Sequence, residues 1–212
     1  MEKLHMKPHK TNGKLITFCG LDGCGKTTMI RRLTESLTDR GIPVFVTKQP
    51  TDDIRKSEIF RSFMDDPDPS RFAYRALSLM AAADRIQHTE KVILLALQEG
   101  YVVISDRYIY SCVANLLARG YEKDQWIYEI AKQLISPDLA FFLDVPVRIA
   151  VERVRMRPEE KDRYIDMHLQ NKLYHAYQDI AKKNNGILLQ SVENEEGTFH
   201  QILNHVEKIL EV

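Results

Sequence analysis

The stretch that decides the fold is GLDGCGKTT, at residues 20–28. It fits the pattern G-x-x-x-x-G-K-[ST], and it stands between the apolar run LITF at 15–18 and a stretch of helical character. Glycines let the backbone turn its N–H groups around an anion, and the following helix adds the positive end of its dipole. The alternative, a glycine turn without a ligand, would make both the lysine–threonine pair and the strand–helix context accidental. The loop therefore predicts a binding site for the phosphates of a nucleoside triphosphate.

The side chains of this loop have distinct expected roles. We expect Lys26 to reach the outer phosphates of ATP and the Thr27 hydroxyl to hold Mg²⁺. Asp22 is either a solvated loop acid or an acid that positions an acceptor or a metal, since the nucleotide would otherwise repel it. Cys24 is either a small packing residue or a thiol activated by the helix dipole and shielded by nucleotide. The expected nucleotide-binding positions are Gly20, Leu21, Asp22, Gly23, Cys24, Gly25, Lys26, Thr27 and Thr28.

Outward from the loop, short β-type runs alternate with helical stretches. The runs are apolar and nearly continuous, which is typical of parallel strands buried on both faces. They lie at 15–18, 43–48, 101–105, 139–145 and 187–190. The helix candidates lie at 26–40, 53–63, 71–99, 111–119, 123–134, 148–155, 164–184 and 198–210. This order predicts an α/β fold of three layers, with a parallel sheet of about five strands flanked by helices. The unusually long candidate at 71–99 is expected to bend or to contain a break.

Composition limits the class of protein further. Thirty basic residues balance thirty acidic ones, so no net field draws the chain to nucleic acid or to an anionic membrane. No apolar stretch approaches the roughly 20 residues of a membrane helix, and the N-terminus lacks the apolar core of a secretory signal. We expect residues 1–12 to form a disordered tail and residues 13–212 a single domain. Three cysteines without metal-like spacing, Cys19, Cys24 and Cys112, favour a cytoplasmic protein with free thiols.

A second motif, YVVISDRY at 101–108, places Asp106 and Arg107 just past the C-terminal end of a buried strand. In open parallel sheets, ligands bind outside that edge. Asp106 can hold Mg²⁺ or act on an acceptor, and Arg107 can clamp a phosphate with two hydrogen bonds. The alternative is a capping acid beside a surface arginine. The pair favours an acceptor that already carries a phosphate over a bare hydroxyl or water.

Together these motifs make the chain resemble the thymidylate kinases, which are ATP-dependent nucleoside monophosphate kinases of the P-loop class. The resemblance runs from Lys14 to the C-terminus. It rests on the order and spacing of GLDGCGKTT, AADRIQH (82–88), VVISDRY, PDLAFFLDVP (137–146) and a late R…DRY segment before a long helix. The resemblance implies the P-loop kinase fold, phosphorylation of dTMP to dTDP with ATP and Mg²⁺, a homodimer, and a mobile lid at about 153–165.

The resemblance also implies roles for individual residues. Gly23 stands where one subgroup of the family has a catalytic arginine, so an arginine of the lid segment RVRMRPEEKDR (153–163) would act instead, which can contribute about 10³–10⁵ in rate. The alternative for the lid is a solvated, charged helix end. The catalytic residues would be Lys26, Asp22, Arg107, Arg157 and Arg163, and the metal ligands Thr27 and Asp106. The acceptor would be bound by Asp22, Lys48, Ala81, Arg85, Asp106, Arg107, Ser111, Cys112 and Asn115.

The presumed base pocket departs from the family pattern. Ala81 stands where the family has a phenylalanine that stacks on thymine, and SCVANLL at 111–117 replaces a segment with polar residues that face the base. Such a ring is worth about 0.5–1.5 kcal/mol beyond its buried area. Cys19 and TKQPTDD at 47–53 also differ from the F-E-G and T-R-E-P-G-G-T patterns of the family.

Several interpretations therefore stay open. One is a thymidylate kinase with a repacked pocket, and another is a kinase for a larger or modified nucleotide. A kinase that acts on a hydroxyl is a third, although Arg107 argues against it, and a non-catalytic ATP-binding regulator is a fourth. In a repacked pocket, an aromatic side chain that supports the base would come from Phe72, Tyr74, Tyr108 or Tyr110.

Overall fold

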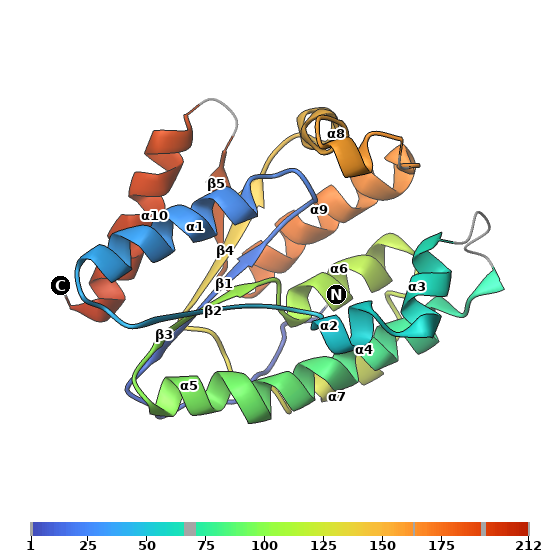
Figure 1. Ribbon diagram of the computed structural model, residues 1–212. Coiled ribbons are helices and arrows are strands. Elements are labelled where there is room, and N and C mark those ends of the chain that lie inside the picture. Colours follow the sequence, from blue (N-terminus) through green and yellow to red (C-terminus); the bar gives the residue numbers. More distant parts are fainter. Residues whose placement is uncertain (1, 66–70, 163, 192–193, 212) are drawn as a thin grey trace.

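In the computed structural model, a parallel sheet is covered by helices on both faces (Figure 1). The structure describes residues 2–65, 71–162, 164–191 and 194–211. The strands are β1 (Lys14–Cys19), β2 (Val44–Lys48), β3 (Val102–Asp106), β4 (Leu139–Asp144) and β5 (Ile187–Gln190). These strands pair in parallel in the order β2-β3-β1-β4-β5. The predicted three-layer α/β fold with five parallel strands is confirmed in the described part of the chain.

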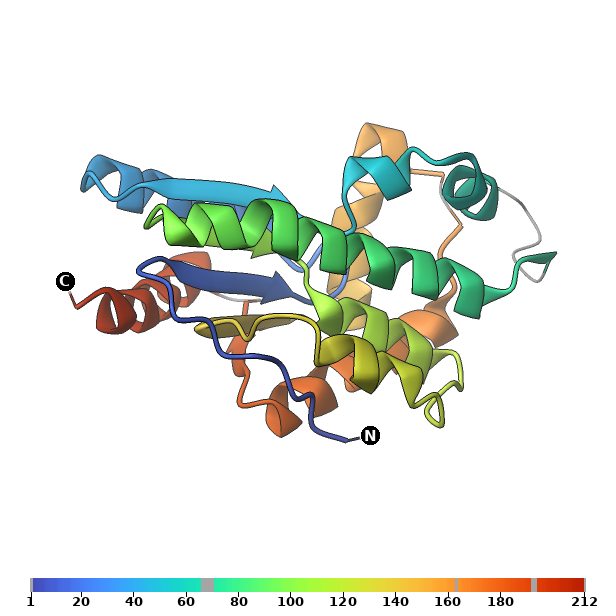
Figure 2. The same cartoon turned by 90° about the horizontal axis from the view of Figure 1, so that it is seen from below.

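Two groups of helices enclose the sheet (Figures 1 and 2). On one face α1 and α10 pack together, and on the other α4, α6 and α9 form the covering layer. None of the described helices is long and apolar enough to cross a membrane. The helices are α1 (Lys26–Asp39), α2 (Asp52–Arg55), α3 (Glu58–Asp65), α4 (Tyr74–His88), α5 (Leu94–Gln98), α6 (Ile109–Ala118), α7 (Trp126–Ala131), α8 (Val147–Arg155), α9 (Met167–Lys183) and α10 (Glu195–Leu210), with the π-helical η2 (Thr89–Ile93) and the 3₁₀-helical η3 (Pro158–Glu160).

The long helix before β3 contains the expected irregularity. A π-helical turn, η2, joins α4 to α5. The three segments together form one long helical rod (Figure 2). The turn follows His88, whose ring hydrogen-bonds to the side chains of Thr47 in β2 (2.9 Å) and of Gln49 just after it (3.1 Å). These bonds fix α4 against the C-terminal end of β2, which is one border of the site described below.

The candidate helix at 53–63 is corrected by the structure, which forms two helices, α2 and α3, in its place. Ser57 stands between them, and its hydroxyl donates to the carbonyl of Ile54 (2.7 Å) and accepts from the N–H of Phe60 (3.4 Å). A serine that competes for backbone groups in this way ends one helix and begins the next. Helix α2 is thereby kept short, close to the end of β2.

The sheet core explains why the site lies at one edge. In β1 the side chains of Leu15, Ile16 and Phe18 are fully buried, as expected for a central strand covered on both faces. In the sheet register, Asp106 at the end of β3 lies between Phe18 of β1 and Lys48 of β2. The chain leaves the apolar core at the same edge on each strand, so polar and charged groups collect there.

The prediction of a disordered tail at residues 1–12 is wrong for the described residues 2–12, which lie against the domain. The side chain of Leu4 is buried, and its N–H donates to Oδ1 of Asn184 at 2.8 Å. Lys7 forms an isolated parallel bridge with Ile135. The segment is mostly polar, so composition indicated disorder, but one apolar anchor and several hydrogen bonds hold it in place.

Replacing this anchor should destabilise the protein measurably. Leu4→Ala removes a buried leucine side chain, and we expect a loss of about 2 kcal/mol in the free energy of unfolding. For a chain of this size the melting temperature would fall by about 4–8 °C. Calorimetry of Leu4→Ala beside His5→Ala, an exposed neighbour, tests this. An unchanged melting temperature in the Leu4 variant would show that the segment contributes nothing to stability.

Candidate active site

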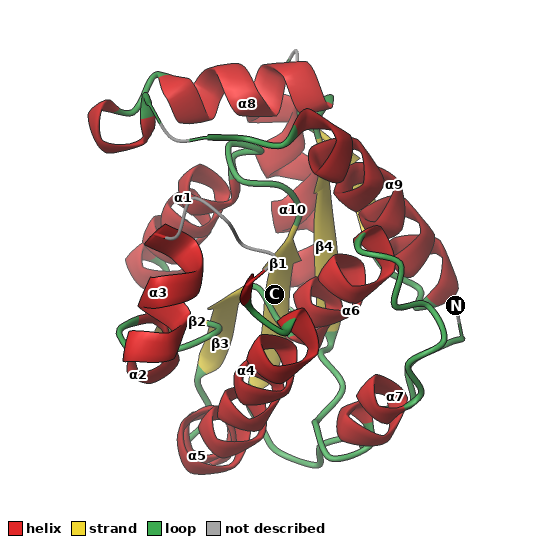
Figure 3. Cartoon of the chain, turned by 90° about the vertical axis from the view of Figure 1, so that its right-hand side faces the viewer, coloured by secondary structure: helices red, strands yellow, loops and turns green. Residues whose placement is uncertain are grey.

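A cavity of about 350 Å³ opens at the C-terminal edge of the sheet. The loop after β1, the ends of β2 and β3, and parts of α2, α8 and α10 form its walls. Figure 3 looks onto this edge, with α8 above the strands and α2 and α3 to one side. Among the described residues that line the cavity, six are cationic and three are acidic. The positive excess suits a polyanionic ligand. The six cations are Lys26, Lys48, Arg55, Arg107, Arg153 and Arg157.

The nucleotide loop needs glycine for two physical reasons. Gly23 has φ +82°, a left-handed conformation that other residues rarely adopt. A Cβ atom at this position would also lie 2.1 Å from the carbonyl oxygen of Ala150 on α8. Helix α8 thus packs directly on the loop, and position 23 has no room for an arginine. Any arginine that assists the reaction has to come from elsewhere, and Arg153 and Arg157 line the same cavity.

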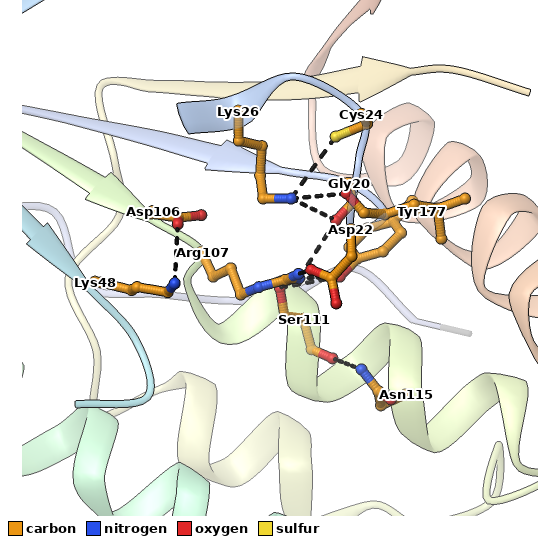
Figure 4. Close-up of polar contacts among 11 residues, drawn as sticks. Gly20, Asp22, Cys24, Lys26, Lys48, Asp106, Arg107, Ser111, Asn115 and Tyr177 are labelled. Atoms are coloured by element: carbon orange, nitrogen blue, oxygen red, sulfur yellow. Dashed lines mark hydrogen bonds and ion pairs between the residues drawn. The ribbon is translucent and has the colours of Figure 1, made fainter. Parts of the chain in front are cut away.

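Lys26 points back into the nucleotide loop (Figure 4). Its ammonium donates to the carbonyl oxygens of Leu21 (2.8 Å) and Gly20 (3.2 Å), and Nζ lies 3.7 Å from Sγ of Cys24. The side chain is only 6% exposed, so the loop itself orients the charge. Thr27 and Thr28, in the first turn of α1, also line the cavity.

Two of the predicted nucleotide-binding residues contribute little side-chain surface to the cavity. Leu21 and Cys24 are buried in the core, and their loop backbone is what they can offer to phosphate. The sulfur of Cys24 lies 2.8 Å from the point where Gly20 would carry a Cβ. The structure therefore favours the interpretation of Cys24 as a compact packing residue.

Arg107 is the centre of a polar cluster that joins three elements (Figure 4). Its Nη2 lies 2.5 Å from Oδ1 of Asp22, and its Nη1 donates to the hydroxyl of Tyr177 (3.0 Å) and to the carbonyl of Gly20 (3.3 Å). Burial acts to lower the pKa of Arg107, but Tyr177, Asp22 and Asp106 outweigh burial and raise that pKa above its ordinary value. The guanidinium is therefore a permanent positive charge beside the nucleotide loop. Asp22 is consequently a positioned acid and not merely a solvated one.

Tyr177, on α9, supports this cluster from behind. Its hydroxyl donates to Oγ of Ser111 (3.1 Å) while it accepts from Arg107. Burial raises the pKa of Tyr177 to about 12, so the hydroxyl keeps its proton. The guanidinium orientation is thus set by groups from the nucleotide loop, α6 and α9 together.

Asp106 and Lys48 lie next to this cluster at the ends of neighbouring strands. Nζ of Lys48 is 3.6 Å from Oδ2 of Asp106. The other carboxylate oxygen, Oδ1, is buried and has no hydrogen-bond partner in the described part of the chain. Thr27, the other predicted metal ligand, is exposed to the same cavity. A carboxylate oxygen with unused capacity and a hydroxyl fit Mg²⁺, which takes one or two protein oxygens and completes its shell with phosphates and water.

The remaining predicted acceptor residues form a second, more buried group around α4 and α6. Arg85 is 2% exposed, and it donates from Nη1 to the carbonyl of Ala81 (2.7 Å) and from Nε to that of Tyr108 (3.3 Å). Asn115 donates to the carbonyl of Ser111 (3.0 Å). Among these described residues, none lines the cavity that holds Lys26 and Arg107. They are Ala81, Arg85, Ser111, Cys112 and Asn115.

Of the four aromatic residues considered for a repacked pocket, Tyr74 lies near this second group with a partly exposed side chain. The charges that act on its hydroxyl include Arg119, Cys112 and Arg85, and burial raises its pKa. Its ring is stacked on Tyr121, with centroids 6.4 Å apart, and the guanidinium of Arg119 lies 4.1 Å from its centroid. Phe72 lies one ring further out, against Phe63, while Tyr108 and Tyr110 are buried in the main core.

The lid prediction can be followed only in part. Arg153, at the end of α8, and Arg157, just before η3, line the cavity. Arg163 lies outside the described residues. In the same part of the sequence, Met156 is 80% exposed and Tyr164 is 86% exposed, so the predicted lid segment presents apolar surface to solvent.

Five further cavity or cluster residues escaped sequence analysis: Met29, Arg55, Tyr177, Ser191 and Glu195. Arg55 follows the end of β2 closely, and the rule that ligands bind at the C-terminal edge of a parallel sheet could have pointed to it. Tyr177 and Glu195 reach the site only through the packing of α9 and α10, for which no local pattern exists.

A glycine-rich loop after the central strand, an inward lysine and arginines from two sides define a P-loop phosphotransferase. Comparison with known sequences narrows this class. The sequence model of the thymidylate kinase family, described as "Thymidylate kinase", matches residues 18–202. The chain therefore belongs to the thymidylate kinase family.

Individual relatives agree with the family model. A protein of Pyrococcus horikoshii named "Probable thymidylate kinase" is 40% identical over 174 residues, which cover 80% of this chain and 83% of that protein. A protein of Thermococcus kodakarensis with the same name is 33% identical over 197 residues, or 90% of this chain and 96% of that protein. A "Thymidylate kinase" of Oceanobacillus iheyensis is 34% identical over 178 residues, or 81% of this chain and 78% of that protein.

Proposed function

We propose that this protein transfers the γ-phosphoryl group of ATP to the 5′-phosphate of dTMP, giving ADP and dTDP. The observation that carries the proposal is the pairing of Asp22, in the nucleotide loop, with Arg107, at the end of β3, at 2.5 Å. The pairing supports the proposal because the nucleotide loop and Arg107 both line one cavity, where a donor and an acceptor phosphate would meet. Membership of the family and the names of the relatives support dTMP as the acceptor.

On the donor side, the loop amides and Lys26 would hold the β- and γ-phosphates. Lys26 would exchange its carbonyl contacts for phosphate oxygens, since its ammonium is already inside the loop. Thr27 and Asp106 would hold Mg²⁺, which neutralises charge on the phosphates when it is bound. Arg157, with Arg163 as a second lid residue, would stabilise the charge of the transferred group.

On the acceptor side, Arg107 and Lys48 would orient the monophosphate. An oxygen of this phosphate attacks the γ-phosphorus in line, and the bond to the β-phosphate oxygen of ATP breaks, so ADP leaves. The protein contributes alignment and charge neutralisation to this step, and little covalent chemistry. Asp22 would keep Arg107 turned toward the nucleotide loop, where the two phosphates meet.

The base would be bound by the second group of predicted residues. Arg85 would address it from α4, and Ser111, Cys112 and Asn115 from α6. Tyr74 would supply an aromatic wall in place of the ring that Ala81 lacks, since the charges of Arg85 and Cys112 act on its hydroxyl. This arrangement supports a thymidylate kinase with a repacked pocket over a kinase for a larger base.

Two further features belong to the proposal. A homodimer would form through the outer surface of α4, η2 and α5, where Leu79 is 46% exposed and Leu95 52% exposed. Burying such side chains against a second copy removes apolar surface from water. A cytoplasmic location suits the three cysteines, which are free and buried.

A screen of acceptors tests the proposed function. ADP release is measured with dTMP, dUMP, UMP, CMP, GMP, AMP and thymidine, and we expect the highest kcat/KM with dTMP. A higher value with another monophosphate would replace the acceptor, and a higher value with thymidine would make the protein a kinase for hydroxyl groups. ATP binding without ADP release for any acceptor would leave a non-catalytic regulator.

A further inference from the structure

Arg119 connects two side chains of the proposed base pocket. It is the C-cap residue of α6. Its Nη1 donates to Oδ1 of Asn115 at 3.1 Å, and its guanidinium carbon lies over the ring of Tyr74, 4.1 Å from the centroid. Asn115 belongs to α6 and Tyr74 to α4, two helices that pack against each other (Figure 3). One guanidinium therefore joins both helices that would enclose the base.

The contact with Arg119 decides how the carboxamide of Asn115 is turned. Its Nδ2 donates to the carbonyl of Ser111 at 3.0 Å, while its Oδ1 accepts from Arg119. A guanidinium has only donors, so a flipped amide would bring two donors face to face. Among the described residues, these contacts use one of the two amide hydrogens and one of the two lone pairs of the oxygen. The amide is thus held in one orientation and can still bond to a base.

The ring of Tyr74 is held mainly by other rings, to which Arg119 adds a charge. Tyr121 lies parallel to it, with an angle of 4° between the planes and 6.4 Å between the centroids. Phe63 of α3 is tilted against it, with centroids 5.9 Å apart. A cation over the face of an aromatic ring is attracted by the quadrupole of the ring. Arg119 therefore restrains Tyr74 with a force that the neutral rings do not supply.

A second arginine in the same region shows how Arg119 differs. Arg75 lies 4.3 Å from the ring centroid of Tyr121 and donates to both carboxylate oxygens of Asp124, at 2.6 and 2.8 Å. An acid thus neutralises the charge of Arg75. Arg119 instead donates to an uncharged amide. Burial raises the pKa of the Tyr74 hydroxyl, and the charge of Arg119 is the main effect that opposes this rise.

We propose that Arg119 is a positioning residue for the base of the acceptor nucleotide: it holds the ring of Tyr74 and the amide of Asn115 in the orientation that binds the base. The inference rests on the proposed function, because it takes dTMP as the acceptor and places its base between α4 and α6. Arg119 acts through these two side chains and not through a contact of its own with the nucleotide. Its removal should weaken binding of the base and leave binding of the phosphates unchanged.

The test compares Arg119→Gln with the wild type, using dTMP, thymidine and 2-deoxyribose 5-phosphate as probes in calorimetric titrations. We expect the affinity for dTMP and thymidine to fall about 3- to 30-fold, because the cation that orients the ring is lost. The affinity for 2-deoxyribose 5-phosphate, which has no base, should stay unchanged. KM for dTMP should rise by the same factor, while kcat and KM for ATP keep their wild-type values. Arg119→Lys restores a cation without the planar fork and should recover part of the affinity.

Arg40→Gln is the matched control, since Arg40 is also a C-cap residue, on α1, and pairs with Glu207 at 2.8 Å. It should keep all these values. In a Tyr74→Leu, Asn115→Ala background, Arg119→Gln should have no further effect on affinity for thymidine, because the side chains through which it acts are gone.

Two results overturn the inference directly: wild-type affinity of Arg119→Gln for dTMP and thymidine, or an undiminished loss in the Tyr74→Leu, Asn115→Ala background. A third is a parallel loss of affinity for ATP and 2-deoxyribose 5-phosphate with a lower melting temperature, because Arg119 would then only stabilise the fold. The wild-type enzyme tests the proposed function separately. If it prefers another monophosphate, that compound and its nucleoside replace dTMP and thymidine in the same comparison.

Discussion

Lys26→Met is expected to lower kcat/KM with dTMP by at least about 10³-fold, because it removes the cation nearest to the transferred group. Methionine keeps the length of the side chain, so the buried position of Lys26 stays filled. The melting temperature should change little compared with the loss of activity. The measurement is ADP release at saturating ATP and dTMP, together with thermal unfolding of the same samples.

Lys132→Met is a suitable control for the lysine variant, since Lys132 is half exposed and pairs with Glu129 far from the loop in sequence. It should keep wild-type activity. Near-normal turnover by Lys26→Met would contradict the assignment of residues 20–28 as the donor site. A variant that does not fold would be replaced by Lys26→Arg, which keeps the charge but misplaces it.

Arg107→Gln is expected to lower kcat/KM with dTMP by about 10²–10³-fold. The variant removes the charge that would hold the acceptor phosphate, and it leaves Asp22 and Tyr177 without their common partner. Arg107→Lys should recover only part of the activity, since the ammonium is a point charge without the planar fork that holds the guanidinium in a fixed orientation. Initial rates with each substrate varied in turn give the effect on dTMP and on ATP separately.

A double variant gives this prediction its control. Asp22→Asn alone should also reduce activity, and the combination with Arg107→Gln should cost less than the product of the two single effects, because the residues act as one pair. Strictly multiplicative effects would show that the pair does not act together. A rise in KM for ATP alone would place Arg107 on the donor side and contradict its assigned role.

Much of the fold could be predicted because its signals are local. The run LITF at 15–18 is largely apolar and is soon followed by Gly20, and the structure places β1 at Lys14–Cys19. The break in the long helix before β3 followed from its length, and it is realised as η2. Element ends were less accurate: α7 covers Trp126–Ala131 within the candidate at 123–134, and α10 begins at Glu195, before the expected start at 198.

The errors have a common physical cause, which is packing between distant segments. The N-terminal segment reads as a polar tail, yet Leu4 finds a place beside Asn184, 180 residues away in sequence. Tyr177 reaches Arg107 across 70 residues. No spacing rule predicts such contacts, because they depend on how whole helices pack on the sheet.

The candidate site also combines residues that local motifs predict with residues whose positions depend on long-range packing. Lys26 and Thr27 belong to a local motif, and Asp106 and Arg107 follow from the rule for strand ends, so both sets could be named from the sequence. The same rule points to the region of Arg55, but which side chain of the short helix α2 lines the cavity depends on packing, including the turn at Ser57. The exclusion of an arginine at Gly23 also needed the structure, because it comes from the backbone of α8.

The most direct test of the central claim is ³¹P NMR of the reaction with ATP, Mg²⁺ and dTMP. If the nucleotide loop and Arg107 bring two phosphates together in one cavity, resonances of dTDP and ADP should appear in equal amounts as those of ATP and dTMP decline. ADP that accumulates with inorganic phosphate while dTMP stays unchanged would show that the cavity does not align an acceptor phosphate, and it would contradict the account.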